Sequence, residues 1–153
     1  MIMRVVLDTN ILIDHVLDRE PFSDTASLIM ELGYLGELEL WMGTSQVSDL
    51  IYVMTEGGKA SLAEWAKSAM ARLLRFIHIY ATDEDDFEAV ASSAWTDLED
   101  AFVFQTASKT KADAIITRDV KGFRNSSIRT FTGEGLFAFL EQEKGFVYAT
   151  ERI

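Results

Sequence analysis

The stretch Arg4-Val5-Val6-Leu7-Asp8-Thr9-Asn10 changes abruptly from β-branched apolar residues to polar ones. β-Branched residues favour strands, and Thr9 or Asn10 is suited to cap a helix over residues 11–17. The stretch therefore predicts a short buried strand that ends at Asp8 and leads directly into a helix.

The rest of the chain repeats this alternation. Thr82 and Thr96 begin capping-box patterns and are the predicted N-caps of two helices. Short strands that alternate with helices are typical of a parallel sheet covered on both faces. We therefore predict an α/β fold, a three-layer α/β/α sandwich with a central parallel sheet of four to five short strands. The further strands are predicted at residues 39–42, 77–80, 114–117 and 128–131, and the further helices at residues 22–32, 44–54, 61–76, 82–94, 96–109 and 135–143.

Length and composition fit one domain. The chain has 153 residues, of which 48% are hydrophobic, and it contains no internal repeat. This is enough apolar material for one core, and two cores would be difficult to build at this size. We predict a single domain over residues 1–145, followed by a C-terminal tail at residues 146–153 that gives no clear signal.

Several classes of protein are disfavoured. The absence of cysteine excludes disulfides and thiolate zinc sites, and only His15 and His78 offer imidazole ligands. Any bound metal is therefore expected to be a hard cation held by oxygen atoms. The apolar run before Asp8 is too short for a signal peptide. No unbroken apolar stretch is longer than that at residues 50–54, which falls far short of the roughly 20 residues needed to span a bilayer. We expect a cytoplasmic protein with no membrane partner.

The charge is distributed unevenly. A formal charge of −11 argues against a nucleic-acid partner. Residues 109–129, however, contain six basic and two acidic residues, so this window carries +4 and the remainder −15. The window could present a basic surface to phosphates, with Arg118, Lys121 and Arg124 as candidates, but an ordinary fluctuation of charge explains it equally well.

Two aspartates follow predicted strands. In open parallel sheets, ligands bind beyond the carboxyl ends of the strands, where Asp8 and Asp119 are expected to lie. Each is a candidate metal ligand. The alternatives are that Asp8 only caps the following helix and that Asp119 only stabilises a turn.

Three further aspartates lie in predicted helices. Asp49 is the only charged residue in the segment 47–54, and a carboxylate among apolar neighbours needs a partner. Asp97 and Asp100 are three residues apart and share a helix face. The helix dipole alone accounts for Asp97 and Glu99, at about 0.3–1 kcal/mol each, but less well for Asp100, which an apolar run follows.

Three motifs in this order resemble the PIN domain family over roughly residues 3–142. They are Leu7-Asp8-Thr9-Asn10, Asp97-Leu98-Glu99-Asp100-Ala101 and the segment from Ile116 to Phe123. The resemblance implies a three-layer α/β/α fold, metal-dependent endoribonuclease activity and catalytic acids at Asp8, Asp100 and Asp119. Asp97 matches an additional acid of the family. Many similar bacterial proteins are toxins of toxin–antitoxin pairs and form homodimers.

One position departs from the family pattern. Asp49 stands where the family usually carries glutamate, and its side chain is one methylene shorter. This raises an alternative in which the protein is a catalytically weak or inactive PIN-fold module that binds RNA or protein. A phosphatase with an aspartyl nucleophile is disfavoured, because such enzymes carry a second aspartate two residues after the first, where this chain has Asn10.

The predicted function is cleavage of single-stranded RNA by water attack at a phosphodiester. We expect Mg²⁺ or Mn²⁺ to be held by the metal ligands Asp8, Asp97, Asp100 and Asp119, with catalysis assigned to Asp8, Asp49, Asp100 and Asp119. Carboxylates that converge repel one another, and a divalent cation relieves that repulsion. Thr9, Asn10 and Thr117 are candidates to orient carboxylates or waters, although they serve equally as caps. The predicted partners are RNA, an antitoxin and a second copy. Trp41, Trp95 and Phe146 are candidate interface residues, although burial in the core is the safer interpretation for each of them.

Overall fold

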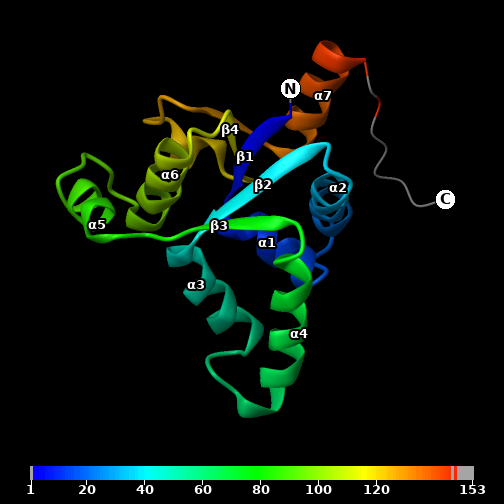
Figure 1. Cartoon of the computed structure of the whole chain (residues 1–153), viewed down its shortest axis with the longest axis vertical. Coiled ribbons are helices and arrows are strands. Elements are labelled where there is room, and N and C mark those ends of the chain that lie inside the picture. The colour runs from blue at the N-terminus through cyan, green and yellow to red at the C-terminus, as the bar shows by residue number, and fades with distance from the viewer. Residues whose placement is uncertain (1, 146, 148–153) are drawn as a thin grey trace.

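A sheet of five parallel strands runs through the middle of the protein (Figure 1). The computed structural model describes residues 2–145 and residue 147. The strands lie in the order β3-β2-β1-β4-β5, so the first strand of the chain is the central one. This confirms the predicted parallel sheet. The strands are β1 (Met3–Leu7), β2 (Leu38–Gly43), β3 (Ile77–Tyr80), β4 (Ala114–Ile116) and β5 (Arg129–Phe131).

The central strands are buried on both faces, which explains their continuous apolar sequence. Val5, Val6 and Leu7 have no measurable exposure, and neither have the three residues of β4. Val6 pairs with Ile115, and Leu7 pairs with Ile116. Because both strands are parallel and end together, the residues that follow them emerge at the same edge of the sheet.

Helices cover both faces of the sheet and complete the three layers. Val5 and Leu7 face a large core that includes residues of α1, α2, α3, α4 and α7, whereas Val6 faces a smaller core with residues of α6. The helices are α1 (Thr9–Val16), α2 (Ser23–Tyr34), α3 (Thr44–Met54), α4 (Ala63–Leu73), α5 (Glu84–Ala91), α6 (Leu98–Thr110) and α7 (Gly133–Lys144). Two short 3₁₀ turns are η1 (Ala60–Leu62) and η2 (Val120–Phe123).

The predicted N-caps of two helices are wrong by one residue. Asp83 caps α5 in place of Thr82, and Asp97 caps α6 in place of Thr96. In each case the aspartate accepts a hydrogen bond from the amide three residues later, and a carboxylate also interacts favourably with the helix dipole. The shift matters for α6, because it makes Asp97 part of the helix entrance.

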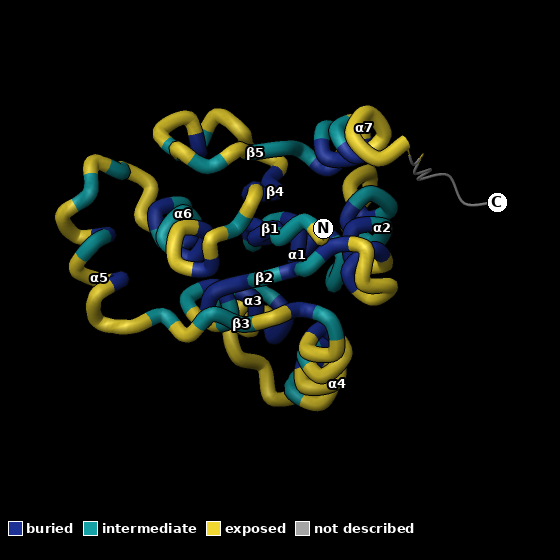
Figure 2. The backbone as a smooth tube through the Cα atoms, turned by 45° about the horizontal axis from the view of Figure 1, so that its top comes forward, coloured by how far each residue is buried: buried dark blue, intermediate teal, exposed yellow. Residues whose placement is uncertain are grey.

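Much of α4 and α5 is exposed (Figure 2). Within residues 2–145 and 147, no helix is long and apolar enough to cross a membrane. Of the predicted tail, only Val147 is described. Phe146, a predicted interface residue, lies outside the described residues.

Candidate metal centre

Asp8 lies where β1 ends and α1 begins. Its side chain is only 8% exposed, and its backbone N–H donates to the carbonyl of Ile116 at 2.9 Å. The Oδ1 atom accepts a hydrogen bond of 2.7 Å from the backbone N–H of Thr9, and the Oδ2 atom accepts one of 2.7 Å from the Thr117 hydroxyl. Asp8 is therefore the N-cap of α1, and the prediction of Thr9 or Asn10 as the cap is wrong, because both residues lie inside the helix. Each carboxylate oxygen has a second lone pair that can still bind a cation.

Asp100 and Asp119 converge on one point from different elements. Asp100 lies in the first turn of α6, and Asp119 caps η2 just beyond β4. A Cβ atom placed on Gly122 would lie 2.7 Å from Oδ2 of Asp100 and 2.9 Å from Oδ2 of Asp119. Oδ2 of Asp100 and Oδ2 of Asp119 therefore both lie close to the same point beside Gly122. Glycine at this position leaves the space into which both carboxylates point.

Asp97 adds a fourth negative charge. Its Oδ1 atom accepts a 3.1 Å hydrogen bond from the backbone N–H of Asp100, which joins the two residues at the start of α6. The charge of Asp97 raises the pKa of both Asp8 and Asp100. The sequence-predicted acids Asp8, Asp97, Asp100 and Asp119 are thus brought together at the carboxyl edge of the sheet.

Asp49 is linked to the carboxylate cluster by its electrostatic interaction with Glu99. Glu99 was not among the predicted site residues. Asp49 is half-buried on α3. Its negative charge is the largest cause of a raised pKa at Glu99, followed by burial and by the charges of Asp97 and Asp8. The helix dipole had seemed sufficient to explain Glu99. The available signal was the density of the Asp97–Asp100 segment, which places three acids in four residues.

Burial and repulsion by neighbouring acids raise the pKa of two carboxylates in the cluster, Asp8 and Asp100. Burial, followed by the charges of Asp8, Asp97, Asp119 and Glu99, raises the pKa of Asp100 to about 7. Burial also raises the pKa of Asp8, although the hydrogen bonds from Thr117 and Thr9 oppose the shift. A nearby cation would reverse both effects, because it favours the charged carboxylates.

The donor set fits a hard divalent cation. All the converging ligands are carboxylate oxygens, which suit Mg²⁺ and Mn²⁺. Within residues 2–145 and 147, no three acidic or histidine side chains form a ready-made cage for one ion. Mg²⁺ does not need such a cage, because it retains several waters and binds through one or two carboxylates.

Two buried polar side chains hold the strand ends in place. The Thr117 hydroxyl donates to Asp8 and accepts from the backbone N–H of Asp119 at 3.0 Å. On the other side, Gln46 donates to the carbonyl of Leu7 at 2.6 Å, and its Oε1 atom accepts from the N–H of Gly43 at 2.9 Å. Thr117 therefore ties β1 to β4, and Gln46 ties β1 to β2 and α3. Nothing in the sequence analysis pointed to Gln46.

Of the predicted phosphate-binding residues, Arg118 forms an ion pair within the protein, with Asp14. Its guanidinium donates to Asp14 at 2.6 and 3.2 Å and lies 4.0 Å from the ring centroid of Phe22. Asp14 is fully buried, so this pair fastens the loop after β4 to α1. Lys121 and Arg124 are exposed in and just after η2.

The candidate interface tryptophans are half-buried. Trp41 stacks on His78 with ring centroids 5.0 Å apart, and Trp95 stacks on Phe104 at 5.3 Å. Both pack against the smaller core. Both rings are therefore largely used inside the fold, in agreement with the interpretation that they belong to the core.

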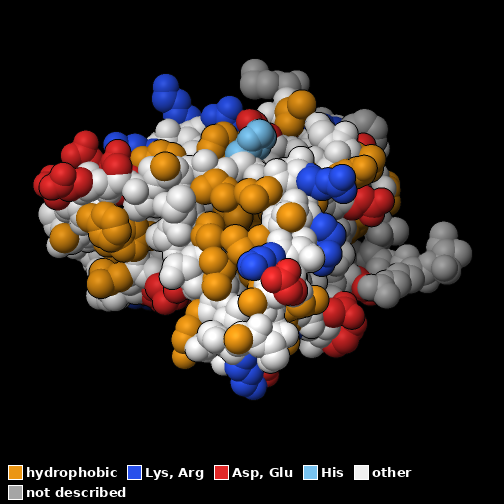
Figure 3. Space-filling model, turned by 60° about the horizontal axis from the view of Figure 1, so that its bottom comes forward, with side chains coloured by type: hydrophobic (Ala, Val, Ile, Leu, Met, Phe, Trp, Pro, Cys, Tyr) orange, Lys and Arg blue, Asp and Glu red, His pale blue; other side chains and the backbone are white. Residues whose placement is uncertain are grey.

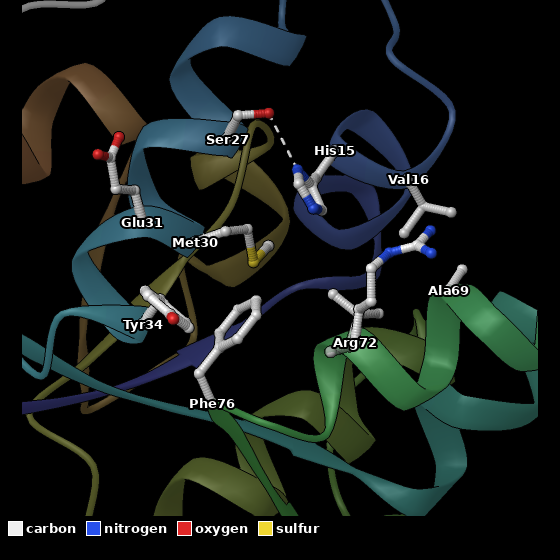
Figure 4. A pocket seen from close by; sticks show the side chains of 10 residues that line it. His15, Val16, Ser27, Met30, Glu31, Tyr34, Ala69, Arg72 and Phe76 are labelled. Carbon is white, nitrogen blue, oxygen red and sulfur yellow. Dashed lines mark hydrogen bonds between the residues drawn. The ribbon is translucent and has the colours of Figure 1, made fainter.

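A separate cavity of about 430 Å³ lies between α1, α2 and α4 (Figure 4). His15 and Ser27 are joined across its upper wall by a 2.9 Å hydrogen bond, while Met30 and Phe76 give it an apolar side. Arg72 extends from α4 and lines another side of the cavity. None of the clustered acids lines this cavity.

The sheet order and the acidic site at its carboxyl edge define an α/β protein with a carboxylate-rich centre at the ends of β1 and β4 and the start of α6. The family model described as the PIN domain matches residues 4–121, which is most of the chain. The chain therefore belongs to the PIN domain family. No curated protein sequence matches it significantly.

Solved structures with the same fold come from toxin–antitoxin complexes. VapBC2 from Rickettsia felis, bound to a promoter DNA fragment, matches with 15% identity and a TM-score of 0.63, covering 85% of this chain and 98% of that one. A toxin–antitoxin complex from Klebsiella pneumoniae matches with 19% identity and a TM-score of 0.63, covering 84% and 97%. VapBC-1 from nontypeable Haemophilus influenzae matches with 20% identity and a TM-score of 0.61, covering 86% and 99%. At these identities the likeness establishes the fold.

Proposed function

We propose that this protein is an endoribonuclease that uses Mg²⁺ or Mn²⁺ to cleave single-stranded RNA by water attack at a phosphodiester. The observation that carries the proposal is the convergence of Asp8, Asp100 and Asp119 from three separate elements. Such a cluster is costly to fold without a cation, so its presence at the ligand-binding edge of a parallel sheet favours a catalytic role.

The acids have two kinds of role in the proposed mechanism, binding of the ion and support of the acids that bind it. Asp8, Asp100 and Asp119 would hold the ion, with Asp97 beside them, and Asp49 would act through Glu99 or a water. A divalent ion bound here lowers the pKa of a water and stabilises charge on the phosphate. Without an ion, Asp100 has a pKa of about 7 and can hold a proton near neutral pH, and a bound ion would displace that proton. Thr117 keeps the Asp8 carboxylate in one orientation.

The distribution of basic residues supports binding of RNA phosphates beside the acids. Lys121 and Arg124 are exposed on the segment that follows Asp119, so they would contact phosphates next to the acids. Single strands suit this arrangement, because a flexible backbone can bring one phosphate to a site at the end of a sheet. Arg118 does not take part in this binding, since Asp14 already binds it.

The proposed partners are an antitoxin and a second copy of the chain. Three of the solved structures with this fold are toxin–antitoxin complexes, which supports a toxin role. The cavity between α1, α2 and α4 has an apolar wall and lies apart from the acids, so a partner's apolar side chain would fit it without entering the metal centre. Light scattering would test the homodimer.

The test is an RNA cleavage assay with purified protein, a labelled single-stranded RNA and Mn²⁺ or Mg²⁺. Asp8→Asn and Asp100→Asn should each lower the rate by about a hundredfold or more, because each removes a charged metal ligand. Glu64→Gln, an exposed change on α4, is the matched control and should leave the rate unchanged. Unchanged cleavage by both aspartate variants would refute the assignment.

A second candidate function follows from Asp49 and from the incomplete ion cage. If the shorter side chain leaves the centre too weak to hold an ion, the protein is a PIN-fold module that binds RNA or protein without cutting. Calorimetric titration separates the two functions: a nuclease binds Mn²⁺ in a manner that Asp100→Asn weakens, whereas a non-catalytic module shows no such difference.

A further inference from the structure

Two large apolar side chains are exposed on α5 and α6, two helices that contact each other. Phe87 is 57% exposed and Leu98 is 56% exposed. Phe102 joins them, because its ring meets that of Phe87 edge-on at 5.0 Å and it lies one helical turn after Leu98. We call the surface formed by Phe87, Leu98 and Phe102 the α5–α6 face. The lobe that carries α5, on the left in Figure 3, shows hydrophobic side chains beside acidic ones.

The exposure of Phe87 is not needed to attach α5 to the protein. That helix is fastened by Asp86, which is fully buried and accepts hydrogen bonds from the Tyr80 hydroxyl at 2.7 Å and from Gln105 at 3.0 Å. Val90, one turn later, is also buried. Because polar contacts already fix the helix, Phe87 is left free at the surface. Adjacent exposed apolar side chains of this size commonly mark an interaction site.

The charge around the α5–α6 face has one sign. Residues 76–108 contain eight acidic residues and no lysine or arginine. No ion pair found among the described residues involves any of these acids. Six of the eight are exposed on or next to α5 and the start of α6: Asp83, Glu84, Asp85, Glu88, Asp97 and Glu99.

We propose that the α5–α6 face binds a protein segment rich in lysine and arginine, with one apolar side chain of that segment seated between Phe87 and Leu98. The apolar side chains would supply the anchor, and the uncompensated acids would select a basic partner. RNA fits less well, because the lysine- and arginine-free segment 76–108 that forms this face carries only acidic charge, which repels phosphates, whereas base-stacking aromatics normally lie in a basic groove. The proposal does not depend on nuclease activity.

The probe is a short fluorescein-labelled peptide of alternating arginine and leucine, titrated against the metal-free full chain with fluorescence anisotropy. Phe87→Ala should weaken binding about tenfold, as expected for the loss of an aromatic anchor. Tyr52→Ala is the matched control: Tyr52 is 68% exposed on α3 and should not affect binding. Glu88→Gln should weaken binding at low salt and reduce its salt dependence.

Hydrogen exchange in the presence of the peptide locates the site. Protection is expected in α5 and in the first two turns of α6, and circular dichroism should show that Phe87→Ala keeps its fold. Equal affinities for Phe87→Ala and Tyr52→Ala would overturn the proposal, because binding would then be unspecific attraction to an acidic protein. So would two other results: weaker binding of a single-stranded RNA by Phe87→Ala, or loss of self-association in that variant.

Discussion

The Thr117 hydroxyl donates a 2.7 Å hydrogen bond to Oδ2 of Asp8, although 109 residues separate the two positions in the chain. The Oγ1 atom of Thr117 also accepts a hydrogen bond from the backbone N–H of Asp119. One fully buried hydroxyl therefore sets the distance between two acids that leave different strands. In a metal site, such an outer contact fixes the direction of the ligand's lone pairs.

Thr117→Val should weaken Mn²⁺ binding by about tenfold to a hundredfold, because the isosteric side chain keeps the volume and removes the hydrogen bond. Calorimetric titration with Mn²⁺ measures the effect. Thr117→Ser retains the hydroxyl and should bind within a few-fold of the original protein. Equal loss in both variants would mean that packing of the methyl group, not the hydrogen bond to Asp8, is what matters.

Gly122→Ala should weaken metal binding without removing any ligand. The added methyl would meet the carboxylates of Asp100 and Asp119 at 2.7 and 2.9 Å, which is closer than such contacts allow. Both carboxylates lie at the ends of flexible side chains, so we expect them to move apart at little cost in stability. Mn²⁺ titration should show a loss of about tenfold, with the thermal midpoint nearly unchanged. Preserved affinity would show that the carboxylates bind an ion elsewhere.

The order of strands and helices was predictable because the apolar pattern is strong. Continuous apolar runs such as Val5–Leu7 and Ala114–Ile116 are buried on both faces, and the sequence analysis placed both as strands. The helix entrances were less certain. Thr82 and Asp83 are both good capping residues, and only tertiary context decides which one accepts the amide.

The site was predictable in part, for a related reason. Asp8 and Asp119 follow strands, so parallel topology alone brings them to one edge. The contribution of Glu99 depends on how near α3 brings Asp49 to α6, and that of Gln46 depends on how α3 packs against the ends of β1 and β2. A one-dimensional pattern contains neither relationship. The pairing of Arg118 was not predictable for a similar reason, because its partner Asp14 lies 104 residues away in the chain.

Arg118→Leu should lower the free energy of unfolding by about 2–3 kcal/mol, because it leaves the buried Asp14 carboxylate without its partner. The pair is partly exposed on the arginine side, which keeps the cost below that of a fully buried pair. The double variant Asp14→Leu with Arg118→Leu should recover much of the loss. Urea denaturation measures both. A double variant as unstable as the single one would indicate that Arg118 stabilises mainly through its contact with Phe22.

Asp49→Asn should lower the pKa of Glu99, because the charge of Asp49 is the largest cause of its raised value. A titration of the Glu99 side-chain carboxyl by ¹³C NMR, in the metal-free protein, measures the change. Asp24→Asn on α2 serves as the control, since the charge of Asp24 is not among the causes of the shift at Glu99. An unchanged titration in Asp49→Asn would separate Asp49 from the carboxylate cluster and leave its catalytic assignment without support.

Asp100 should make the metal-free protein less stable as the pH rises. Its pKa is about 7 in the folded protein and 3.8 as the reference value, so folding favours the protonated carboxyl. The stabilisation is fully present below about pH 4 and is lost as the pH rises through about 7. Asp100→Asn removes this dependence. In EDTA, the variant should therefore gain on the order of 1 kcal/mol relative to the original protein between pH 5 and pH 8, after allowance for the partial exposure of Asp100.

Urea denaturation at both pH values measures this difference, and comparing the two proteins cancels the contributions of Asp8 and Glu99 to the extent that they are independent of Asp100. The lowered pKa of Asp86 does not interfere, because its effect falls below pH 4. Added Mn²⁺ should stabilise the original protein at pH 8 more than the variant, since the ion replaces the proton as the source of positive charge. If the two proteins differ by the same amount at pH 5 and pH 8, Asp100 is already ionised at pH 5. The repulsion that we ascribe to the cluster would then be too weak to require a cation.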